Sequence, residues 1–501
     1  MNEKQLGKTI WYLLLAFSTL MLINKILLVF TYRFEIAGLE PYFSYLVLKV
    51  NSGQLFTNPE QFPFIVTQYS PLYFYVVNAF AEVLQWLGIH EVRAVYIVGR
   101  GINLMANLVT CLLVYRLFKR YLKLDKKWAF LVSMVVFNLF INHNIGVRTD
   151  SLKILFLSAM FIQLLIIIKA QSLSNWISFT VFAILALLCK QDALVPVLMA
   201  LLILFSYKYY VKSIVFGAVV GLVSGLTILG LCNWKFEILT LNLLGGISQG
   251  MNLNWWLDIV RLNYLTFAVQ LFFLIVGVKW LISKKYNFVW ILSLVVIYVA
   301  AFMALFKWGS NFNYFIEFQI ISAVLVLYIT FASNTNHFKW LTLVCFAAIF
   351  FNNFQNKNVS IPNFWVERDA FYLFNEMKLN ANKISEEVLK DKEAIICFDL
   401  KYPLFLNEKS IQWAMVNDYP EVFLPKLESL SSELPIQVFN YHYDCSNEKL
   451  VDAILMSPSK NAIWDAKKLN NVFKRTKETD LLQLQLYNEW DNYNFYEIKC
   501  P

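Results

Sequence analysis

Residues 10–31 read IWYLLLAFSTLMLINKILLVFT, an apolar run long enough to cross a bilayer as a single helix. Further apolar runs follow it closely, as far as about residue 351. A cleaved signal peptide has a shorter apolar core and is not followed by a series of spans, so we expect this run to remain as the first membrane helix. With 58% hydrophobic and 15% charged residues in a chain of 501, the sequence predicts a polytopic membrane protein.

Basic clusters indicate which loops face the cytoplasm, because Lys and Arg are enriched there. The densest cluster is KRYLKLDKK at 119–127. The apolar segment after Pro71 is predicted to lie in or dip into the outer interface, since counting it as a crossing would place that cluster outside. With the N-terminus inside, the predicted membrane helices are at about 10–31, 94–116, 128–145, 152–169, 176–189, 194–210, 213–232, 259–281, 287–306, 315–333 and 338–352.

The composition changes after residue 352. The net charge is +14 before that point and −5 after it, so the basic surplus is a topology signal and no nucleic-acid partner is expected. We predict an all-α polytopic membrane domain over 1–352, with about eleven transmembrane helices, juxtamembrane helices and a long first outer loop at 32–92. A small α/β domain outside the cytoplasm is predicted over 353–501. Its expected elements are a helix at 366–391 and strand-like segments at 394–400 and 434–441.

Carboxylates gather on one face of this predicted topology. Twelve Asp and Glu residues precede residue 353, and ten of them fall on the outer side: Glu35, Glu40, Glu60, Glu82, Glu91, Asp150, Asp192, Glu237, Asp258 and Glu317. Carboxylates beside hydrocarbon are costly and usually serve a function. We therefore expect a polar site with enzyme-like chemistry at the outer face.

Four stretches bring polar side chains to outer helix ends. They are AGLEPYF at 37–43, NHN with RTD at 142–150, KQD at 190–192 and KWGSNFNYFIE at 307–317. Carboxylates beside cations suit a reaction in which a hydroxyl loses a proton while a phosphate leaves, because one carboxylate acts as the base and the cations stabilise the negative charge.

These motifs resemble a known family. Glu40-Pro41, SGQLFTNPEQFPF (52–64) and QYSPLYFY (68–75) resemble the first outer loop of GT-C class lipid-linked-sugar transferases, near the bacterial aminoarabinose transferases and protein O-mannosyltransferases. RTDSLK, CKQD and GSNFNYFIE extend the resemblance to about residue 335. It implies an inverting glycosyltransferase of the bacterial inner (plasma) membrane, which moves a sugar from polyprenyl phosphate to an extracytoplasmic glycan, lipid or protein. Ser70-Pro71-Leu72 replaces the Lys-Pro-Pro of aminoarabinose transferases, which argues against assuming a lipid A acceptor.

The resemblance also implies roles for particular residues. The family's first-loop acid falls on Glu40, where many relatives have Asp, and its second acid falls on Asp150; both are candidate catalytic groups and ligands of Mg²⁺ or Mn²⁺. On charge and placement, the candidates for binding the donor phosphate are Arg148, Lys190, Lys307 and Arg100. The candidates for contacting substrate are Tyr42, Tyr69, Tyr73, Asn311, Tyr314 and Glu317.

Other interpretations stay open at this point. Glu40 and Asp150 could each cap the helix that follows, and Lys190 could form a local ion pair with Asp192. The chain could instead be a transporter or flippase of lipid-linked glycans, which would place polar residues along a path through the membrane. Only Glu3 and Asp125 fall on the inner side, so a one-sided site, and with it the transferase, is the preferred hypothesis.

Overall fold

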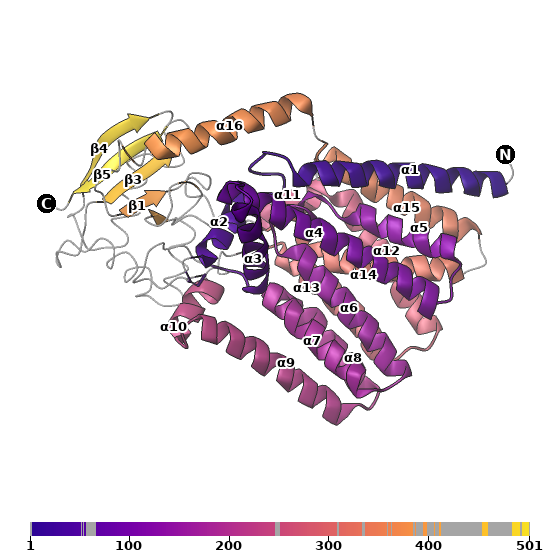
Figure 1. The fold of residues 1–501 in the computed structure, drawn as a ribbon. Helices are drawn as coiled ribbons and strands as arrows, with labels where there is room; N and C mark the ends of the chain where they lie inside the picture. The colour runs from indigo at the N-terminus through magenta and orange to yellow at the C-terminus, as the bar shows by residue number, and fades with distance from the viewer. Residues whose placement is uncertain are drawn as a thin grey trace.

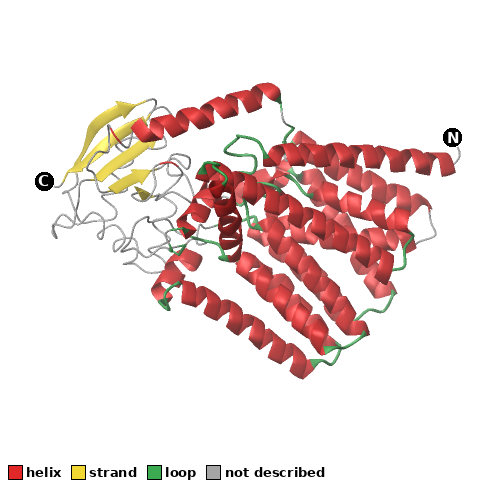
Figure 2. Cartoon of the chain, in the orientation of Figure 1, coloured by secondary structure: helices red, strands yellow, loops and turns green. Residues whose placement is uncertain are grey.

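The structure is a computed structural model of the whole chain. It describes residues 3–56 except 52 and 54, 67–245, 251–307, 310–332, 336–361 except 358, and 363–383, and in the remainder of the tail residues 386 and 405 and five strands. The described part is a bundle of long helices with a sheet beyond one end (Figures 1 and 2).

Each predicted membrane span coincides with a helix of the bundle. These helices are α1 (Glu3–Val29), α4 (Glu91–Arg116), α5 (Lys126–Leu139), α6 (Asp150–Lys169), α7 (Leu173–Cys189), α8 (Leu194–Ser206), α9 (Tyr210–Leu231), α12 (Tyr264–Ser283), α13 (Phe288–Ala304), α14 (Ile316–Ala332) and α15 (Asn336–Gln355). Runs of apolar residues favour helices here, because in hydrocarbon the backbone must satisfy its hydrogen bonds within the helix, and Pro196 lies in the first turn of α8, where proline is tolerated.

The helices differ in whether they are long enough to cross a membrane. Among the described residues, six spans are long and apolar enough: 11–29, 91–121, 150–169, 210–231, 264–283 and 312–331. The apolar helices at 173–189, 191–206, 288–304 and 341–355 are shorter, and α5 has 14 residues. A helix rises about 1.5 Å per residue, so these fall short of the ~20 residues that a full crossing needs. The prediction of a multi-helix membrane fold is confirmed, with six spans supported by length rather than eleven.

Short helices collect at the end of the bundle that lies near the sheet. They are α2 (Glu40–Val50), α3 (Leu72–Trp86), α10 (Phe236–Leu239) and α11 (Leu253–Leu262). The predicted helix after Pro71 is α3, which runs across the direction of the bundle helices in Figure 1 and is not among the helices long enough to span. Its exposed side includes Phe80 and Trp86, as expected of a helix lying at an interface.

Single turns of 3₁₀ or π helix connect several of these elements. They are η1 (Leu117–Tyr121), η2 (Asn142–Asn144), η3 (Gln191–Ala193), η4 (Thr240–Gly245) and η5 (Phe312–Phe315). The turns η2, η3 and η5 lie just before α6, α8 and α14 respectively. Each of these three turns contains part of a polar stretch identified above. The turns lie at helix ends, so they bring those stretches to one end of the bundle.

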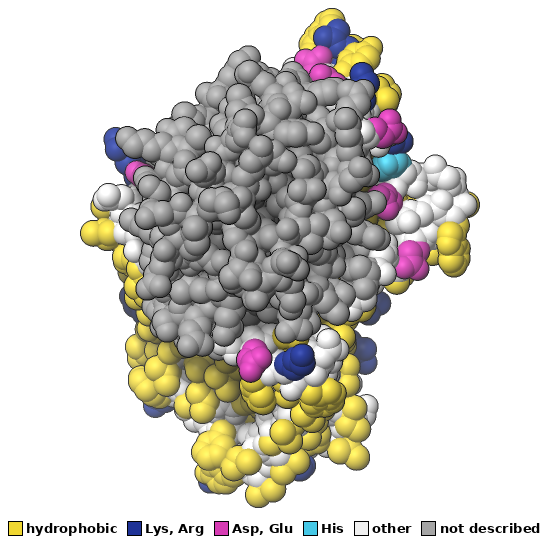
Figure 3. Space-filling model, turned by 90° about the vertical axis from the view of Figure 1, so that its left-hand side faces the viewer, with side chains coloured by type: hydrophobic (Ala, Val, Ile, Leu, Met, Phe, Trp, Pro, Cys, Tyr) yellow, Lys and Arg dark blue, Asp and Glu magenta, His cyan; other side chains and the backbone are white. Residues whose placement is uncertain are grey.

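Apolar side chains fill the bundle and also cover its outside. Phe137, Phe273 and Phe346 are buried in a core shared by α1, α4, α5, α12, α14 and α15. In contrast, Ile214 and Leu222 of α9 are more than half exposed. Figure 3 shows apolar side chains over much of the described surface in the lower part of the view. A surface this apolar is typical of contact with lipid.

In the tail, α16 (Phe364–Lys383) confirms the predicted helix and is followed by strands β1 (Ala394–Cys397), β2 (Ser410–Ile411), β3 (Ala453–Pro458), β4 (Gln483–Trp490) and β5 (Tyr493–Lys499). The sheet order is β2-β1-β3-β5-β4; β1 pairs in parallel with β2 and β3, and the pairings of β5 are antiparallel. The strand predicted at 394–400 corresponds to β1, and the one at 434–441 lies outside the described residues. A separate domain over 353–501 stays a prediction.

Candidate active site

Five segments far apart in the sequence meet at the end of the bundle near α2 and α3. They are the first loop before α2, the middle of α4, the segment between η2 and the first turn of α6, the junction of α7 with η3, and η5 with the first turn of α14. The described polar groups at this end fall into two sets. One is closed around Glu40, and the other reaches the surface through Asp192 and Glu317.

Glu40 is fully buried and bound on both oxygens. Its Oε1 accepts hydrogen bonds from Arg100 Nε at 2.9 Å and from Val147 N at 2.7 Å, and its Oε2 accepts from Arg100 at 3.0 Å and from Ile36 N at 2.6 Å. Arg100 also donates to the carbonyls of Thr31 (3.0 Å) and Arg33 (2.7 Å). This network ties the first loop to α4 and to the segment before α6.

Two glycines allow the backbone to approach Glu40 this closely. A Cβ at Gly146 would lie 2.3 Å from the Ala37 Cβ and 3.0 Å from the Glu40 carboxylate, so only glycine fits there. Gly38 has a φ of +56°, a conformation that other residues rarely adopt. The sequence AGLE thus turns the loop so that the Glu40 side chain points into the protein.

The predicted roles of Glu40 and Arg100 as groups that contact substrate are not supported by this arrangement. Neither side chain is exposed, and four hydrogen bonds join the Arg100 guanidinium to the Glu40 carboxylate and two carbonyls. A buried, fully paired Arg–Glu pair is a structural unit, and separating it would leave an unpaired buried charge. In this structure both side chains hold the first loop against the bundle, and any contact of theirs with substrate stays a prediction.

The second set begins at Asp150, the first residue of α6. Its Oδ1 accepts a hydrogen bond from Lys190 Nζ at 2.7 Å, and its Oδ2 lies 3.4 Å from Arg148 Nε and 3.3 Å from Asn313 Nδ2. Arg148 also donates to the carbonyls of Ala37 (2.9 Å) and Gly38 (2.7 Å), which connects this set to the first loop. Asp150 is thus surrounded by donors and is almost completely buried.

Beyond Lys190 the charges alternate. The Lys190 ammonium is also 3.3 Å from Asp192 Oδ2, while Lys153 Nζ lies 2.8 and 2.9 Å from the two Asp192 oxygens and pairs with Glu317. The order Asp150–Lys190–Asp192–Lys153–Glu317 is called the charge ladder below. Its inner members are buried, whereas the Asp192 side chain is 31% exposed and that of Glu317 is 13% exposed. Asp192 is therefore the carboxylate of the ladder that a substrate can reach.

Aromatic rings enclose the Lys190 ammonium. It lies 4.5 Å from the centre of the Tyr314 ring and 5.8 Å from that of Tyr69. Burial by itself disfavours the ammonium, but the carboxylates Asp150 and Asp192 hold the pKa of Lys190 well above its ordinary range. Lys190 is therefore a fixed positive charge with two ring faces beside it, and the half-buried Tyr314 is placed to contact a ligand at that charge.

Lys307 differs from the other cations. It is half-buried, forms no ion pair with any described carboxylate, and its charge interacts with Tyr314, Lys190 and Asp192. Burial lowers its pKa. Its backbone is held by an isolated bridge to Met251, and Phe306 beside it accepts a hydrogen bond from Asn252 N at 2.8 Å. An ammonium without a carboxylate partner, beside the ladder, suits the binding of an anion.

The remaining predicted site residues differ in how deeply they are buried. Asn311 is half-buried and bonds to His143 Nε2 at 2.9 Å; burial lowers the pKa of His143 to about 3, so this imidazole is neutral. Tyr42 is fully buried, and Tyr73 donates to the Gly99 carbonyl at 3.2 Å within the protein. The structure thus places Tyr314, Tyr69 and Glu317 at the ladder and Asn311 beside His143, while Tyr42 and Tyr73 are buried within the protein.

A divalent cation does not fit the carboxylates predicted to bind it. Each oxygen of Glu40 is held by Arg100 and a backbone N–H, and Asp150 is held by Lys190, Arg148 and Asn313. Among the described residues no three His, Cys, Asp or Glu side chains are grouped as metal ligands. Mg²⁺ and Mn²⁺ need several free oxygens, and here built-in cations occupy them. The predicted metal-binding role of Glu40 and Asp150 therefore does not agree with the geometry.

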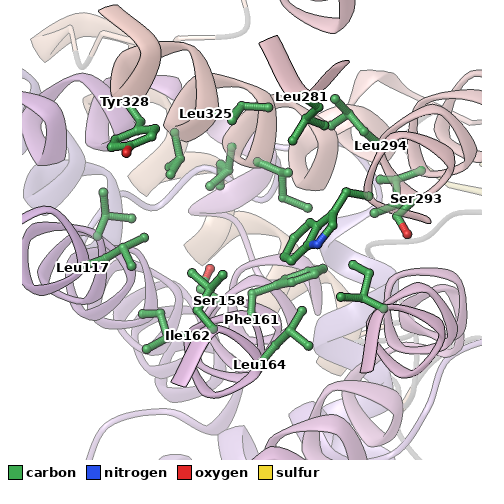
Figure 4. A pocket seen from close by; sticks show the side chains of 18 of the residues that line it. Leu117, Ser158, Phe161, Ile162, Leu164, Leu281, Ser293, Leu294, Leu325 and Tyr328 are labelled. Atoms are coloured by element: carbon green, nitrogen blue, oxygen red, sulfur yellow. The ribbon is translucent and has the colours of Figure 1, made fainter. Parts of the chain in front are cut away.

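An apolar cavity of about 290 Å³ lies in the bundle among α6, α12, α13 and α14 (Figure 4). Phe161, Leu281, Leu294 and Leu325 point into it. A smaller cavity of about 20 Å³ shares part of this lining and is also lined by Glu317. The lining therefore runs from apolar side chains to the last carboxylate of the ladder.

Sequence reasoning missed Lys153 and undervalued Asp192. Both were within motifs singled out above, RTDSLK and CKQD. Lys153 lies three residues after Asp150 and so shares its helix face, which is a signal that could have found it. That Lys153 meets Asp192 across two helices is a tertiary contact with no local signal.

The fold is similar to that of several solved structures. ArnT from Cupriavidus metallidurans bound to undecaprenyl phosphate matches with a TM-score of 0.55 and 10% identity, over 97% of this chain and 97% of that one. The archaeal oligosaccharyltransferase AglB from Archaeoglobus fulgidus, in complex with an inhibitory peptide and a dolichol-phosphate, matches with a TM-score of 0.53 and 11% identity, over 98% and 74%. The A. fulgidus oligosaccharyltransferase in complex with Zn and sulfate matches at 0.52 and 13%, over 96% and 72%.

These proteins are GT-C glycosyltransferases, so the predicted resemblance is confirmed at the level of the fold over nearly the whole chain. No family model matches the chain, and no curated protein matches it by sequence. At about one residue in ten identical, the likeness establishes the fold and leaves the reaction to be argued from the site.

Proposed function

We propose that this chain is an inverting glycosyltransferase that moves a sugar from a polyprenyl-phosphate donor to an acceptor outside the cytoplasm, in the inner membrane of a bacterium. The observation that carries the proposal is that a cation and a carboxylate with different environments lie together beside the charge ladder. Lys307 is a cation that pairs with none of the described carboxylates, and Asp192 is a partly exposed carboxylate whose charge interacts with it. One suits a leaving phosphate and the other suits the removal of a proton.

The apolar cavity supplies the third element that such a donor needs. A polyprenyl phosphate combines a long apolar chain with an anionic head, so it requires an apolar space that ends at cations. The cavity beside α6 and α14 is lined by apolar side chains, and its smaller neighbour is lined by Glu317 of the ladder. Access from the lipid side would allow the chain to enter without crossing water.

In the proposed reaction, Lys307 and Lys190 bind the phosphate of the donor, and Asp150 keeps Lys190 in place. Asp192 accepts the proton of the acceptor hydroxyl, whose oxygen attacks the anomeric carbon from the side opposite the phosphate. The bond from that carbon to the phosphate oxygen breaks, and the released polyprenyl phosphate keeps the electron pair. Attack from the opposite side inverts the anomeric configuration. No step needs a bound metal ion.

The test follows the release of free polyprenyl phosphate by purified protein in detergent. A panel of polyprenyl-phosphate sugars is supplied with a cell-envelope extract as acceptor. We expect release by the wild type with at least one donor, and a loss of about 100-fold in Asp192→Asn, the size expected when a positioned base is removed. Glu82→Gln is the matched control, because Glu82 hydrogen-bonds only to Asn78 of its own helix among the described residues.

Two results would contradict the proposed function. If the wild type releases no polyprenyl phosphate from any donor but moves lipid-linked glycans across vesicle membranes, the transferase is excluded and the transporter takes its place. Equal release by Asp192→Asn and the wild type would exclude Asp192 as the base.

A further inference from the structure

Lys153 is a buried lysine to which the proposed reaction gives no direct part. It lies in the first turn of α6 and its side chain is 1% exposed. A buried ammonium is costly unless it is paired and hydrogen-bonded. Lysine rather than an apolar residue at this position therefore requires an explanation.

The contacts of Lys153 match the capacity of its ammonium. Lysine has three N–H donors. Its partners are likewise three oxygens: both Asp192 oxygens, at 2.8 and 2.9 Å, and Glu317 Oε1. One positive charge thus joins two carboxylates that come from different segments, η3 and α14. Without it, these two carboxylates would repel each other with Lys190 as the remaining cation beside Asp192.

Bridging two carboxylates from separate helices is the arrangement that a divalent cation usually has in a protein. Here the ammonium occupies that place, and Lys190 bridges Asp150 and Asp192 in the same manner. We propose that Lys153 is a positioning residue that supplies the charge a divalent cation would supply between Asp192 and Glu317, so that the site works without a bound metal. This inference deepens the proposed function, because Asp192 is the proposed base.

The proposal predicts what happens when the ammonium is removed. Lys153→Ala leaves two carboxylates facing a space that the side chain has vacated, next to the existing small cavity lined by Glu317. Such a space, lined by carboxylate oxygens, suits Mn²⁺ or Mg²⁺. Lys153→Met is the matched control, since it removes the charge but keeps the side chain nearly as long, so that the space stays filled.

The experiment measures Mn²⁺ binding by electron paramagnetic resonance on the full-length protein in detergent, together with release of polyprenyl phosphate. For the wild type we expect no Mn²⁺ bound at this site, and equal release with and without EDTA. For Lys153→Ala we expect about one Mn²⁺ bound, absent in Lys153→Ala/Asp192→Asn. Its release should fall about 100-fold in EDTA and recover at least about tenfold with millimolar Mn²⁺. Lys153→Met should lose release without recovery.

Several results would overturn the inference. They are Mn²⁺ binding by the wild type that depends on Asp192, loss of wild-type release in EDTA with recovery by Mn²⁺, full release by Lys153→Ala in EDTA, or a folded Lys153→Ala that binds no Mn²⁺. If Lys153→Ala does not fold, the inference is decided by Mn²⁺ binding to the wild type and by wild-type release with and without EDTA. If the wild type acts on no donor, the proposed function fails while Mn²⁺ binding still tests the role of Lys153.

Discussion

At the scale of single residues, the charged groups of the site differ in burial and in how many partners hold them. Asp150 and Lys153 are buried and fully paired, Lys190 is paired but lies against two rings, and Lys307 has no described carboxylate partner. Fixed charges of this kind stabilise a charged transition state without having to reorganise. In the proposed reaction, Lys307 is the cation that gains a partner when the donor phosphate binds.

Lys307 gives the site a predicted pH dependence. Burial lowers the pKa of Lys307, so its ammonium loses its proton at a lower pH than an ordinary lysine does. Donor binding should therefore be intact at low pH and weaken as the pH rises through that pKa. Lys307→Arg should move this weakening to higher pH, because arginine stays protonated. The measurement is the KM for donor across pH; identical profiles for the two proteins would exclude a phosphate-binding role.

Asp150 is predicted to act through Lys190. Asp150→Asn removes the partner at 2.7 Å and leaves Lys190 nearer to Asp192, away from the phosphate. We expect the kcat/KM for donor to fall about tenfold or more, as it does when a group that orients an active-site residue is lost. Asp258→Asn, at an exposed position on α11, is the control and should leave the rate unchanged. A normal rate in Asp150→Asn would contradict the role given to Asp150.

At the scale of elements, the first loop is fixed from two directions. Arg100 of α4 and Glu40 hold it from within the bundle, while Glu367 of α16 pairs with Arg33 at 2.9 Å on the outside. The rings of Tyr32 and Phe34 pack against Phe374 of α16 as well. The start of the loop, at residues 32–40, thus lies between the bundle and the first helix of the tail, and contacts on both sides hold it beside the site.

The two attachments should differ in strength. Glu40→Gln leaves Arg100 buried without a counterion and should lower the free energy of unfolding by about 3 kcal/mol. Glu367→Gln breaks a partly exposed pair and should lower it by less than about 1 kcal/mol. Thermal unfolding of both variants in detergent provides the comparison. Equal midpoints would mean that the Glu40–Arg100 pair does not hold the loop.

The elements also show what the sequence could and could not predict. Hydrophobic runs predicted where the bundle helices lie in the sequence, because a backbone in hydrocarbon has few alternatives to a helix. The sequence also identified four of the stretches that form the site. It did not predict that Glu40 faces Arg100, since the residues lie on separate elements and only Gly146 and Gly38 allow the approach. Nor did it indicate which carboxylates are already paired with cations, so the metal-binding role of Glu40 and Asp150 stays a prediction that their hydrogen bonds do not support.

At the scale of the whole molecule, polar and apolar functions are separated along the bundle. The charge ladder lies at the end near α2 and α3, and the apolar cavity lies between helices further along α6 and α14. Basic residues such as Lys119 and Arg120 lie at the opposite end of α4 from Glu91. This polarity agrees with a site on the outer side of a membrane and a basic loop on the inner side.

Labelling of single cysteines tests this orientation. In a background with Cys397, Cys445 and Cys500 replaced by serine, Leu87→Cys should react in intact cells with a membrane-impermeant maleimide. Arg120→Cys should react only after permeabilisation. Both positions are exposed, and the other four cysteines are buried. The reverse pattern would place the charge ladder in the cytoplasm and contradict the proposed location.

The most direct test of the central claim uses wild-type protein in vesicles with a donor labelled in both its sugar and its lipid. Transfer of the sugar to acceptor and release of polyprenyl phosphate are measured together with movement of intact donor across the membrane. We predict one polyprenyl phosphate released for each sugar transferred, an inverted anomeric centre in the product, and no protein-dependent movement of the donor. Movement of intact donor without release would contradict the account.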